Sequence, residues 1–248
     1  IRRPARVAPK ASLAYRSNMT LNTVALYAAL AAAAAGLGPI LSRVQGPEDR
    51  FVGLANALAA GMMLGLAYPL MRDGLDAGTV SATIGASAAV VALFLVHVWF
   101  ELDGGEAISP VRALIGASVH SAPEGLALGV ACAVDARFGA VVALTLALHN
   151  VGEGIALSSY LVQREKRLRA VAAAALSNLP QIALAIAGFV LAEARPELRP
   201  ALLGGAAGSL IYLSLADLLP SGYHVAGRQA ISVVVIAATS MVAFVGAL

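Results

Sequence analysis

Two histidine–glutamate pairs stand inside hydrophobic stretches of this 248-residue sequence. His120 precedes Glu124 by four positions, and His149 precedes Glu153 by the same interval. Both pairs belong to the pattern His-x-x-x-Glu-Gly-x-Ala-Leu, whose two copies are 29 residues apart. Residues four positions apart share one face of a helix, so each pair would present an imidazole beside a carboxylate. An interhelical hydrogen bond would explain one buried histidine, but the same pair in two spans favours a functional site.

A pocket in which both pairs meet would bring two carboxylates and two imidazoles together. Like charges repel when they share a buried site, and a bound divalent cation removes that repulsion. Nitrogen and carboxylate ligands suit zinc, and they also suit iron and manganese. Pro123 directly precedes Glu124 and removes a backbone hydrogen bond, which predicts a kink at this point. The chemistry indicated is reversible binding of a divalent metal ion.

The composition places these pairs in a membrane. Hydrophobic residues make up 59% of the chain, charged residues only 12%, and the mean hydropathy is +0.81. An ordinary soluble domain has about 25% charged residues, so a soluble enzyme, a disordered chain and a nucleic-acid-binding domain are excluded. The single cysteine, Cys132, excludes an internal disulfide and is expected to be a buried apolar side chain.

The predicted fold class is all-α, a polytopic membrane protein with eight transmembrane helices. A span needs about 20 mostly apolar residues. Eight stretches meet this condition: Leu21–Leu41, Phe51–Met71, Thr79–Phe100, Pro110–Val134, Phe138–Val162, Leu168–Ala192, Arg199–Leu219 and Gln229–Leu248. The short breaks make neighbouring spans antiparallel, so the two motifs lie on an inverted pair, spans four and five. Inverted repeats that meet near the bilayer midplane are a common way to build a transport site.

Charge placement sets the expected topology and domain organisation. Residues 21–248 are predicted to form one transmembrane domain, preceded by a basic tail at residues 1–20. The tail is interpreted as a solvated segment at the membrane surface, with the remnant of an organelle transit peptide as the alternative. The basic loop between spans five and six contains Arg164, Lys166, Arg167 and Arg169. The positive-inside rule places this loop in the cytoplasm or its equivalent, and both termini on the opposite face.

The motifs and the span pattern resemble the ZIP family of zinc- and iron-regulated divalent metal transporters. The resemblance rests on residues 120–125 (HSAPEG) and 149–154 (HNVGEG), and extends over the bundle from about Leu21. Residues 59–64 look like the family's second span, residues 176–181 like its sixth and residues 208–220 like its seventh. The resemblance implies eight spans, termini on the extracytoplasmic face and transport of metal toward the cytosol.

The resemblance also implies a set of metal ligands. Carried over by position, they are Met63, His120, Ser121, Glu124, His149, Asn150, Glu153 and Gln181. Ser121 stands where asparagine is usual and Gln181 where glutamate is found, which puts a second metal position in doubt. One well-formed site is therefore expected, with the two histidine–glutamate pairs as its main ligands.

Three polar residues outside the motifs have competing interpretations. Asp217, close to Pro220, is either near the cytoplasmic exit or an interfacial residue, and the resemblance favours the exit. His97 and the acidic loop beyond it could form a cytoplasmic metal relay, but an interfacial anchor beside a solvated loop is favoured. The same interpretation is given to His224.

The predicted function is transport of a divalent metal ion, zinc before iron or manganese, toward the cytosol by alternating access. An intramembrane metalloenzyme such as a hydrolase is the alternative, although the sequence lacks the His-Glu-x-x-His pattern of zinc proteases. Transport of an organic solute is disfavoured by the paired imidazoles. No prosthetic group is expected, and the only bound metal is the transported ion. The expected partners are that ion and the bilayer, with a homodimer left open and no nucleic acid; the location is a plasma, inner or organelle membrane.

Overall fold

Helices account for the fold of the described part of the chain. A computed structural model describes residues 18–41, 49–102, 110–161 and 167–247, and no strand occurs among them. In chain order the elements are α1 (Leu21–Ala34), α2 (Leu37–Leu41), α3 (Arg50–Leu102), α4 (Pro110–Val134), α5 (Ala136–Leu161), α6 (Arg167–Leu176), α7 (Leu179–Ala194), the 3₁₀ turn η1 (Pro196–Leu198), α8 (Arg199–Leu213), the π-helical turn η2 (Ser214–Leu218), α9 (Leu219–Ala226) and α10 (Arg228–Ala247). The all-α prediction is confirmed. The basic tail at residues 1–17, and Arg164 and Lys166 of the basic loop, lie outside the described residues.

In the described part of the chain, six helical segments are long and apolar enough to cross a membrane, judged by length and composition alone. They are Leu21–Leu41, Arg50–Trp99, Ala136–Leu161, Arg167–Ala194, Pro196–Ala226 and Arg228–Gly246. The second of these contains 50 residues, far more than one crossing needs. Seven of the eight predicted stretches overlap these segments, and the predicted span Pro110–Val134 is not among them. The boundaries of α3 need a closer description.

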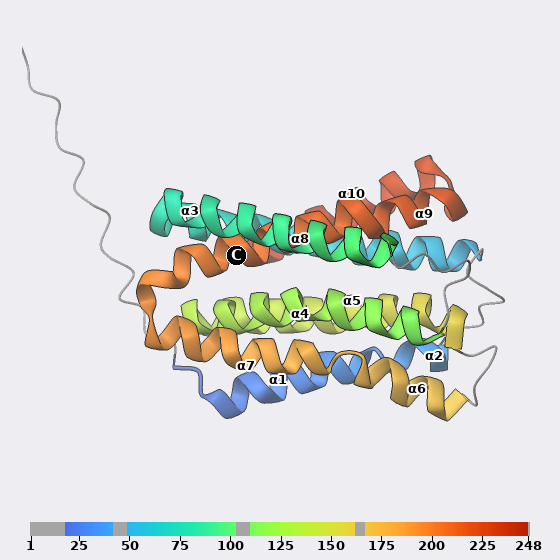
Figure 1. The fold of residues 1–248 in the computed structure, drawn as a ribbon, viewed down its shortest axis with the longest axis horizontal. Helices are drawn as coiled ribbons and strands as arrows, with labels where there is room; N and C mark the ends of the chain where they lie inside the picture. Colours follow the sequence, from blue (N-terminus) through green and yellow to red (C-terminus); the bar gives the residue numbers. More distant parts are fainter. Residues whose placement is uncertain (1–17, 42–48, 103–109, 162–166, 248) are drawn as a thin grey trace, which may run out of the picture.

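The long helix α3 folds back on itself at Gly78. The backbone there is extended, with φ 178° and ψ 91°, and the residues on both sides are helical. Asn56 and His97 line one pocket, although 41 residues of straight helix would separate them by about 60 Å. Figure 1 shows the resulting two arms of α3 side by side. The reversal turns one continuous apolar segment into two antiparallel helical arms.

Two other predicted spans are interrupted helices. The stretch Leu21–Leu41 divides into α1 and α2, and Leu168–Ala192 divides into α6 and α7 at Ser177 and Asn178. Pro180 follows the second break, where its missing N–H is tolerated in the first turn of α7. α4, by contrast, continues through Pro123. The interruption in the sixth predicted stretch places polar backbone close to the centre of the bundle.

The helices form two layers. One layer, called the α3 layer, contains α3, α8, η2, α9 and α10; the other, called the α5 layer, contains α1, α2, α4, α5, α6 and α7 (Figure 1). Glycines allow very close helix contacts inside each layer: a Cβ at Gly204 would collide with the carbonyl of Ala82, and one at Gly129 with the carbonyl of Ala185. Small residues serve this purpose in membrane bundles, where backbones must approach closely to pack.

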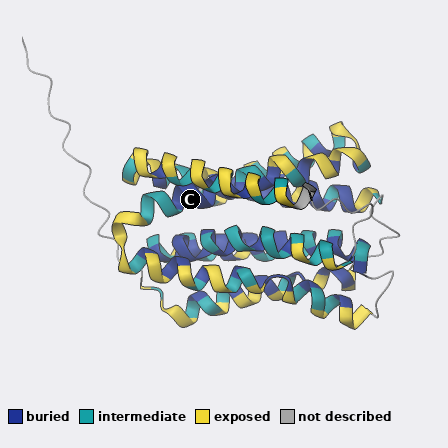
Figure 2. Cartoon of the chain, viewed as in Figure 1, coloured by how far each residue is buried: buried dark blue, intermediate teal, exposed yellow. Residues whose placement is uncertain are grey.

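The two layers meet through small residues of α3 and α5. A Cβ added to Gly152 of α5 would lie 3.3 Å from the carbonyl oxygen of Ala55 in α3 and 3.8 Å from the Cβ of Ala59. Buried residues concentrate where the layers face each other, and exposed residues cover the outer face of α3 (Figure 2). That outer face carries large apolar side chains, Ile84, Phe94 and Trp99 among them, as expected for a surface in contact with lipid.

Candidate metal site

Three ligand-bearing side chains meet where α4 and α5 face each other. Glu124, His149 and Glu153 each offer a ligand atom, and these atoms lie within 4.8 Å of one another. Glu124 is fully buried and His149 is 1% exposed. One oxygen of each carboxylate, Oε2, is buried without a hydrogen-bond partner. Two unpaired buried oxygens beside an imidazole form a group that could hold a metal ion.

The hairpin of α4 and α5 sets the position of these side chains. The two helices are separated only by Asp135, whose carboxylate accepts a hydrogen bond from the N–H of Phe138 at 2.8 Å. A Cβ at Gly139 would lie 2.6 Å from the Sγ of Cys132, so the antiparallel helices pack tightly at the turn. Cys132 is itself buried, as predicted. The tight hairpin aligns Glu124 of one helix with Glu153 of the next.

His149 is oriented from both sides of its ring. Its Nε2 lies 2.9 Å from Oε1 of Glu124, and its Nδ1 lies 3.2 Å from the carbonyl oxygen of Ala59 in α3. A carbonyl oxygen only accepts, so Nδ1 donates its proton to Ala59. A backbone carbonyl on the second ring nitrogen fixes the orientation of metal-binding histidines and directs the other nitrogen to the ion. His149 thus presents Nε2 to the two carboxylates.

Asn150 and Gln181 lie in a buried amide contact on the inner side of the α5 layer. The Nδ2 of Asn150 donates to Oε1 of Gln181 at 2.8 Å and to the carbonyl of Ala31 at 2.8 Å. Oδ1 of Asn150 and Nε2 of Gln181 are buried without a hydrogen-bond partner. These two predicted ligands therefore connect α1, α5 and α7 through neutral groups.

Two further predicted ligands, Ser121 and Met63, have other contacts. The hydroxyl of Ser121 donates to the carbonyls of Ser118 at 3.1 Å and Ser177 at 3.3 Å, which joins α4 to the break between α6 and α7. Met63 is fully buried in the hydrophobic core of the bundle. Neither residue belongs to the three-residue group.

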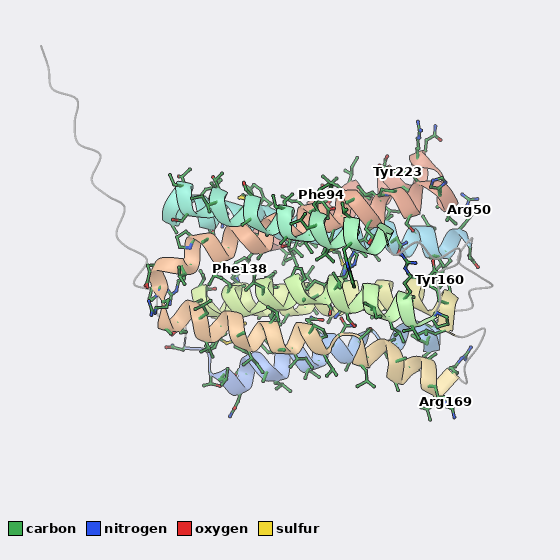
Figure 3. The ribbon with its side chains drawn as sticks, in the orientation of Figure 1. Arg50, Phe94, Phe138, Tyr160, Arg169 and Tyr223 are labelled. Atoms are coloured by element: carbon green, nitrogen blue, oxygen red, sulfur yellow. The ribbon has the colours of Figure 1, made fainter. Side chains whose placement is uncertain are left out.

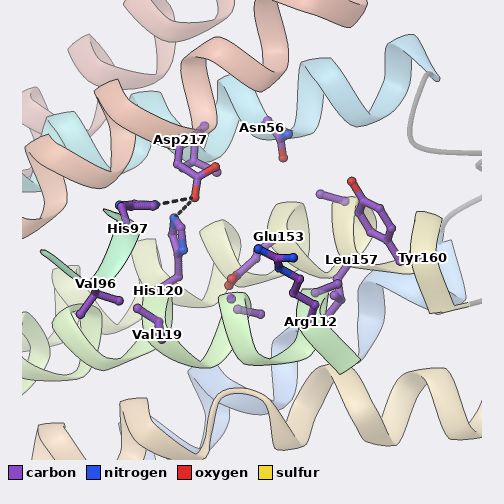
Figure 4. Close-up of a pocket in the computed structure, with 15 residues that line it drawn as sticks. Asn56, Val96, His97, Arg112, Val119, His120, Glu153, Leu157, Tyr160 and Asp217 are labelled. Carbon is purple, nitrogen blue, oxygen red and sulfur yellow. Dashed lines mark ion pairs between the residues drawn. The ribbon is translucent and has the colours of Figure 1, made fainter. Parts of the chain in front are cut away.

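His120 points away from that group, toward Asp217. Its Nε2 lies 3.3 Å from Oδ2 of Asp217, and Nε2 of His97 lies 3.6 Å from the same oxygen. All three side chains line a pocket of about 330 Å³ that Glu153 also lines, as Figure 4 shows. Asp217, interpreted from the sequence as a residue near the exit, thus lines this pocket. His97, favoured as an interfacial anchor, lies in the same pocket.

No local sequence signal groups His97 with His120, because they belong to helices of different layers. The sequence feature closest to Asp217 that indicates an irregular helix is Pro220. Asp217 lies in the π-helical turn η2, and Pro220 lies in the first turn of the following helix, α9. Such turns often occur at functional sites. The pattern of residues alone does not show which histidine Asp217 meets.

The arrangement of Glu124, His149, Glu153 and the adjoining pocket suits reversible binding of a divalent ion. Glu124 and Glu153 supply two negative charges, His149 supplies a neutral nitrogen, and the pocket beside Glu153 provides a path of polar side chains toward one end of the bundle. Nitrogen and carboxylate ligands match zinc and neighbouring transition metals.

Comparisons with known proteins agree with this chemistry. The pattern of the family described as "ZIP Zinc transporter" matches residues 106–247, which is more than half of the chain. An Arabidopsis thaliana protein named "putative zinc transporter" is 30% identical over 239 residues, covering 91% of this chain and 39% of that protein. The chain thus spans less than half the length of this curated relative. The family is one of transporters and not of enzymes, and the apolar helices indicate a multi-pass integral membrane protein. The chain belongs to the ZIP zinc transporter family.

Proposed function

We propose that the protein carries a divalent metal ion across the membrane, and that Glu124, His149 and Glu153 form the core of its transport site. The observation that carries this proposal is the convergence of their ligand atoms within 4.8 Å inside an apolar bundle. Two carboxylates this close repel each other, and a dication relieves the repulsion. The relative's name and the family description support metal transport as the activity.

Zinc is the proposed ion, and one ion is proposed per site. The two glutamates balance the charge of one dication. The neighbouring Asn150 and Gln181 are neutral amides that hydrogen-bond each other, so they add no charge for a second ion. Iron and manganese use the same ligand types and compete in any test of selectivity.

We further propose eight membrane crossings with an inverted pair at the site. The two arms of α3 count as separate crossings because the chain reverses at Gly78, and α4, with 25 residues, is long enough to be the eighth. The basic residues Arg167 and Arg169 begin α6 at the end of the bundle where Tyr160 also lies (Figure 3). Tyr160 lines the pocket beside Glu153. The positive-inside rule then makes this the cytosolic end, so the pocket opens toward the cytosol.

Movement of one layer against the other is the proposed transport mechanism. Spans one, four, five and six belong to the α5 layer, and spans two, three, seven and eight belong to the α3 layer. Helices within each layer are in glycine-mediated contact, as at Gly204 and Gly129. Two layers whose helices each pack closely suit alternating access in which the metal site moves with α4 and α5.

Uptake of radioactive zinc into proteoliposomes tests this function. The unmodified protein should accumulate zinc, whereas His149→Ala and Glu124→Gln should abolish most of the uptake. Glu197→Gln is the matched control, because Glu197 lies at the surface in a contact with Arg195. Uptake unchanged by both site substitutions would refute the site. Hydrolysis of a peptide substrate without zinc transport would instead support the intramembrane enzyme.

A further inference from the structure

Two histidines make polar contacts across the boundary between the layers. His149 of the α5 layer donates from Nδ1 to the carbonyl of Ala59 in the α3 layer. His120, also of the α5 layer, places Nε2 3.3 Å from Oδ2 of Asp217 in the α3 layer. Both histidines were predicted as metal ligands from the sequence. The contacts that join the layers therefore use the same side chains as the predicted site.

The two contacts differ in the nitrogen that they occupy. His149 uses Nδ1 for Ala59 and keeps Nε2 directed at Glu124, so metal binding and the interlayer contact are compatible. His120 instead turns Nε2 toward Asp217, and this nitrogen is buried without a hydrogen-bond partner. Coordination of a metal through Nε2 of His120 would require the ring to leave Asp217.

Asp217 also lies beside a histidine of its own layer. His97 of α3 approaches the same oxygen, Oδ2, at 3.6 Å. Ser214, at the start of the π-helical turn, donates to the carbonyl of Leu210 at 2.7 Å and lies 3.4 Å from the carbonyl of Ala60. The carboxylate thus belongs to the α3 layer, whereas His120 belongs to the layer that carries the cluster.

We propose that Asp217 competes with the metal ion for His120, and that this competition links metal occupancy to the contact between the layers. The inference rests on the proposed transport function. In the metal-free carrier, His120 lies on Asp217 and joins the two layers. When metal binds beside Glu124, one turn along α4 from His120, the imidazole leaves Asp217 and completes the site. The interlayer contact is then lost only in the loaded carrier.

Asp217 is therefore a positioning residue, and its removal should strengthen zinc binding. The side chains of His120 and Asp217 are 13% and 44% exposed, so their contact is worth no more than a partly exposed ion pair. Loss of such a competitor should tighten zinc binding by about two- to fivefold in Asp217→Ala. If Asp217 were a metal ligand, the same substitution would weaken binding, which would overturn the proposal.

Binding of zinc to purified protein, measured by isothermal titration calorimetry, gives the sign of the effect. Ser221→Ala is the control, because it removes a hydrogen bond from Asn56 within the α3 layer and should leave affinity unchanged. In a His120→Ala background, Asp217→Ala should have no effect, since the competition needs the imidazole. A gain in affinity that persisted without His120, or no gain in the unmodified background, would refute the inference. Failure of the unmodified protein to bind zinc would refute the proposed function instead.

Spin labels on the two layers test the link to movement. Val141 of α5 and Val245 of α10 line a second pocket, of about 510 Å³, that spans both layers. With cysteines at these two positions and Cys132→Ala as background, zinc should change the distribution of label distances. Asp217→Ala should shift the zinc-free distribution toward the zinc-bound one. If the zinc-free distributions of label distances and the mobility of the layers are the same with and without Asp217, Asp217 has no role in the contact between the layers. Thermal melting of each variant confirms that it is folded.

Discussion

Glu124→Gln separates the roles of charge and shape at the proposed site. The substitution keeps the size of the side chain and a polar group beside Nε2 of His149, which lies 2.9 Å from Oε1 of Glu124. It removes one of the two charges that would balance a dication. Because Glu124 is fully buried and His149 is 1% exposed, water cannot replace the lost charge.

The magnitude follows from that burial. Removing one member of a buried ion pair costs about 3–5 kcal/mol. Applied to bound zinc, this loss weakens affinity by about a hundredfold to several thousandfold. The metal-free protein should not lose stability, because the substitution also removes the repulsion between Glu124 and Glu153. The thermal midpoint without zinc should therefore stay the same or rise, while the stabilisation conferred by zinc disappears.

Calorimetric zinc titration and thermal melting of the same samples check both parts. Glu197→Gln makes the same chemical change on a side chain that is 62% exposed and should behave as the unmodified protein. Zinc affinity within threefold of the unmodified value in Glu124→Gln would refute the siting of the metal. A large drop in the zinc-free midpoint would show that Glu124 serves the fold and not the ion.

Three further substitutions or conditions have defined outcomes. Gln181→Glu adds a third buried carboxylate beside Asn150, so the zinc content of purified protein, measured by mass spectrometry, should rise from one ion toward two; unchanged content would contradict the charge argument. Gly204→Leu should lower the thermal midpoint strongly because its Cβ would collide with the Ala82 carbonyl, whereas Gly116→Ala, with nothing within 4 Å of the added Cβ, should not. Zinc uptake should fall as the pH is lowered, because protons compete with metal for imidazole and carboxylate. An uptake rate that does not change between neutral and acid pH would argue against these ligands.

The sequence predicted the site as two faces, and the structure shows how the faces meet. The spacing of four residues places Glu124 one turn from His120 whatever the fold. In this structure, however, the three-residue group contains Glu124 and the other pair, His149 and Glu153, while His120 faces Asp217. Helical periodicity fixes which side chains share a face. It does not fix which side chain on that face turns toward which neighbouring helix.

The reversal of the chain within α3 is a second feature that the sequence predicted only in part. Separate spans were predicted on either side of residues 72–78, and the structure reverses direction at Gly78 with helix up to that residue. The observed turn is thus much shorter than the loop predicted from the polar residues. Arg72 and Asp73 continue the helix, and their side chains pair with each other at 2.8 Å. Charged residues at the end of a span can remain helical when they pair beside the interface.

The amino-acid sequence by itself determined that this protein lies in a membrane and is helical, and it indicated which chemistry its polar residues could carry out. Few charges and long apolar runs require helices in a membrane, and two His-x-x-x-Glu pairs indicate metal binding. The tertiary structure decided which ligands converge: it brought Glu153 to Glu124, gave His149 a carbonyl from α3, and paired His120 with Asp217 of the other layer. These contacts join residues far apart in the chain, and they depend on how closely glycine-bearing helices pack, which is a property of the whole bundle.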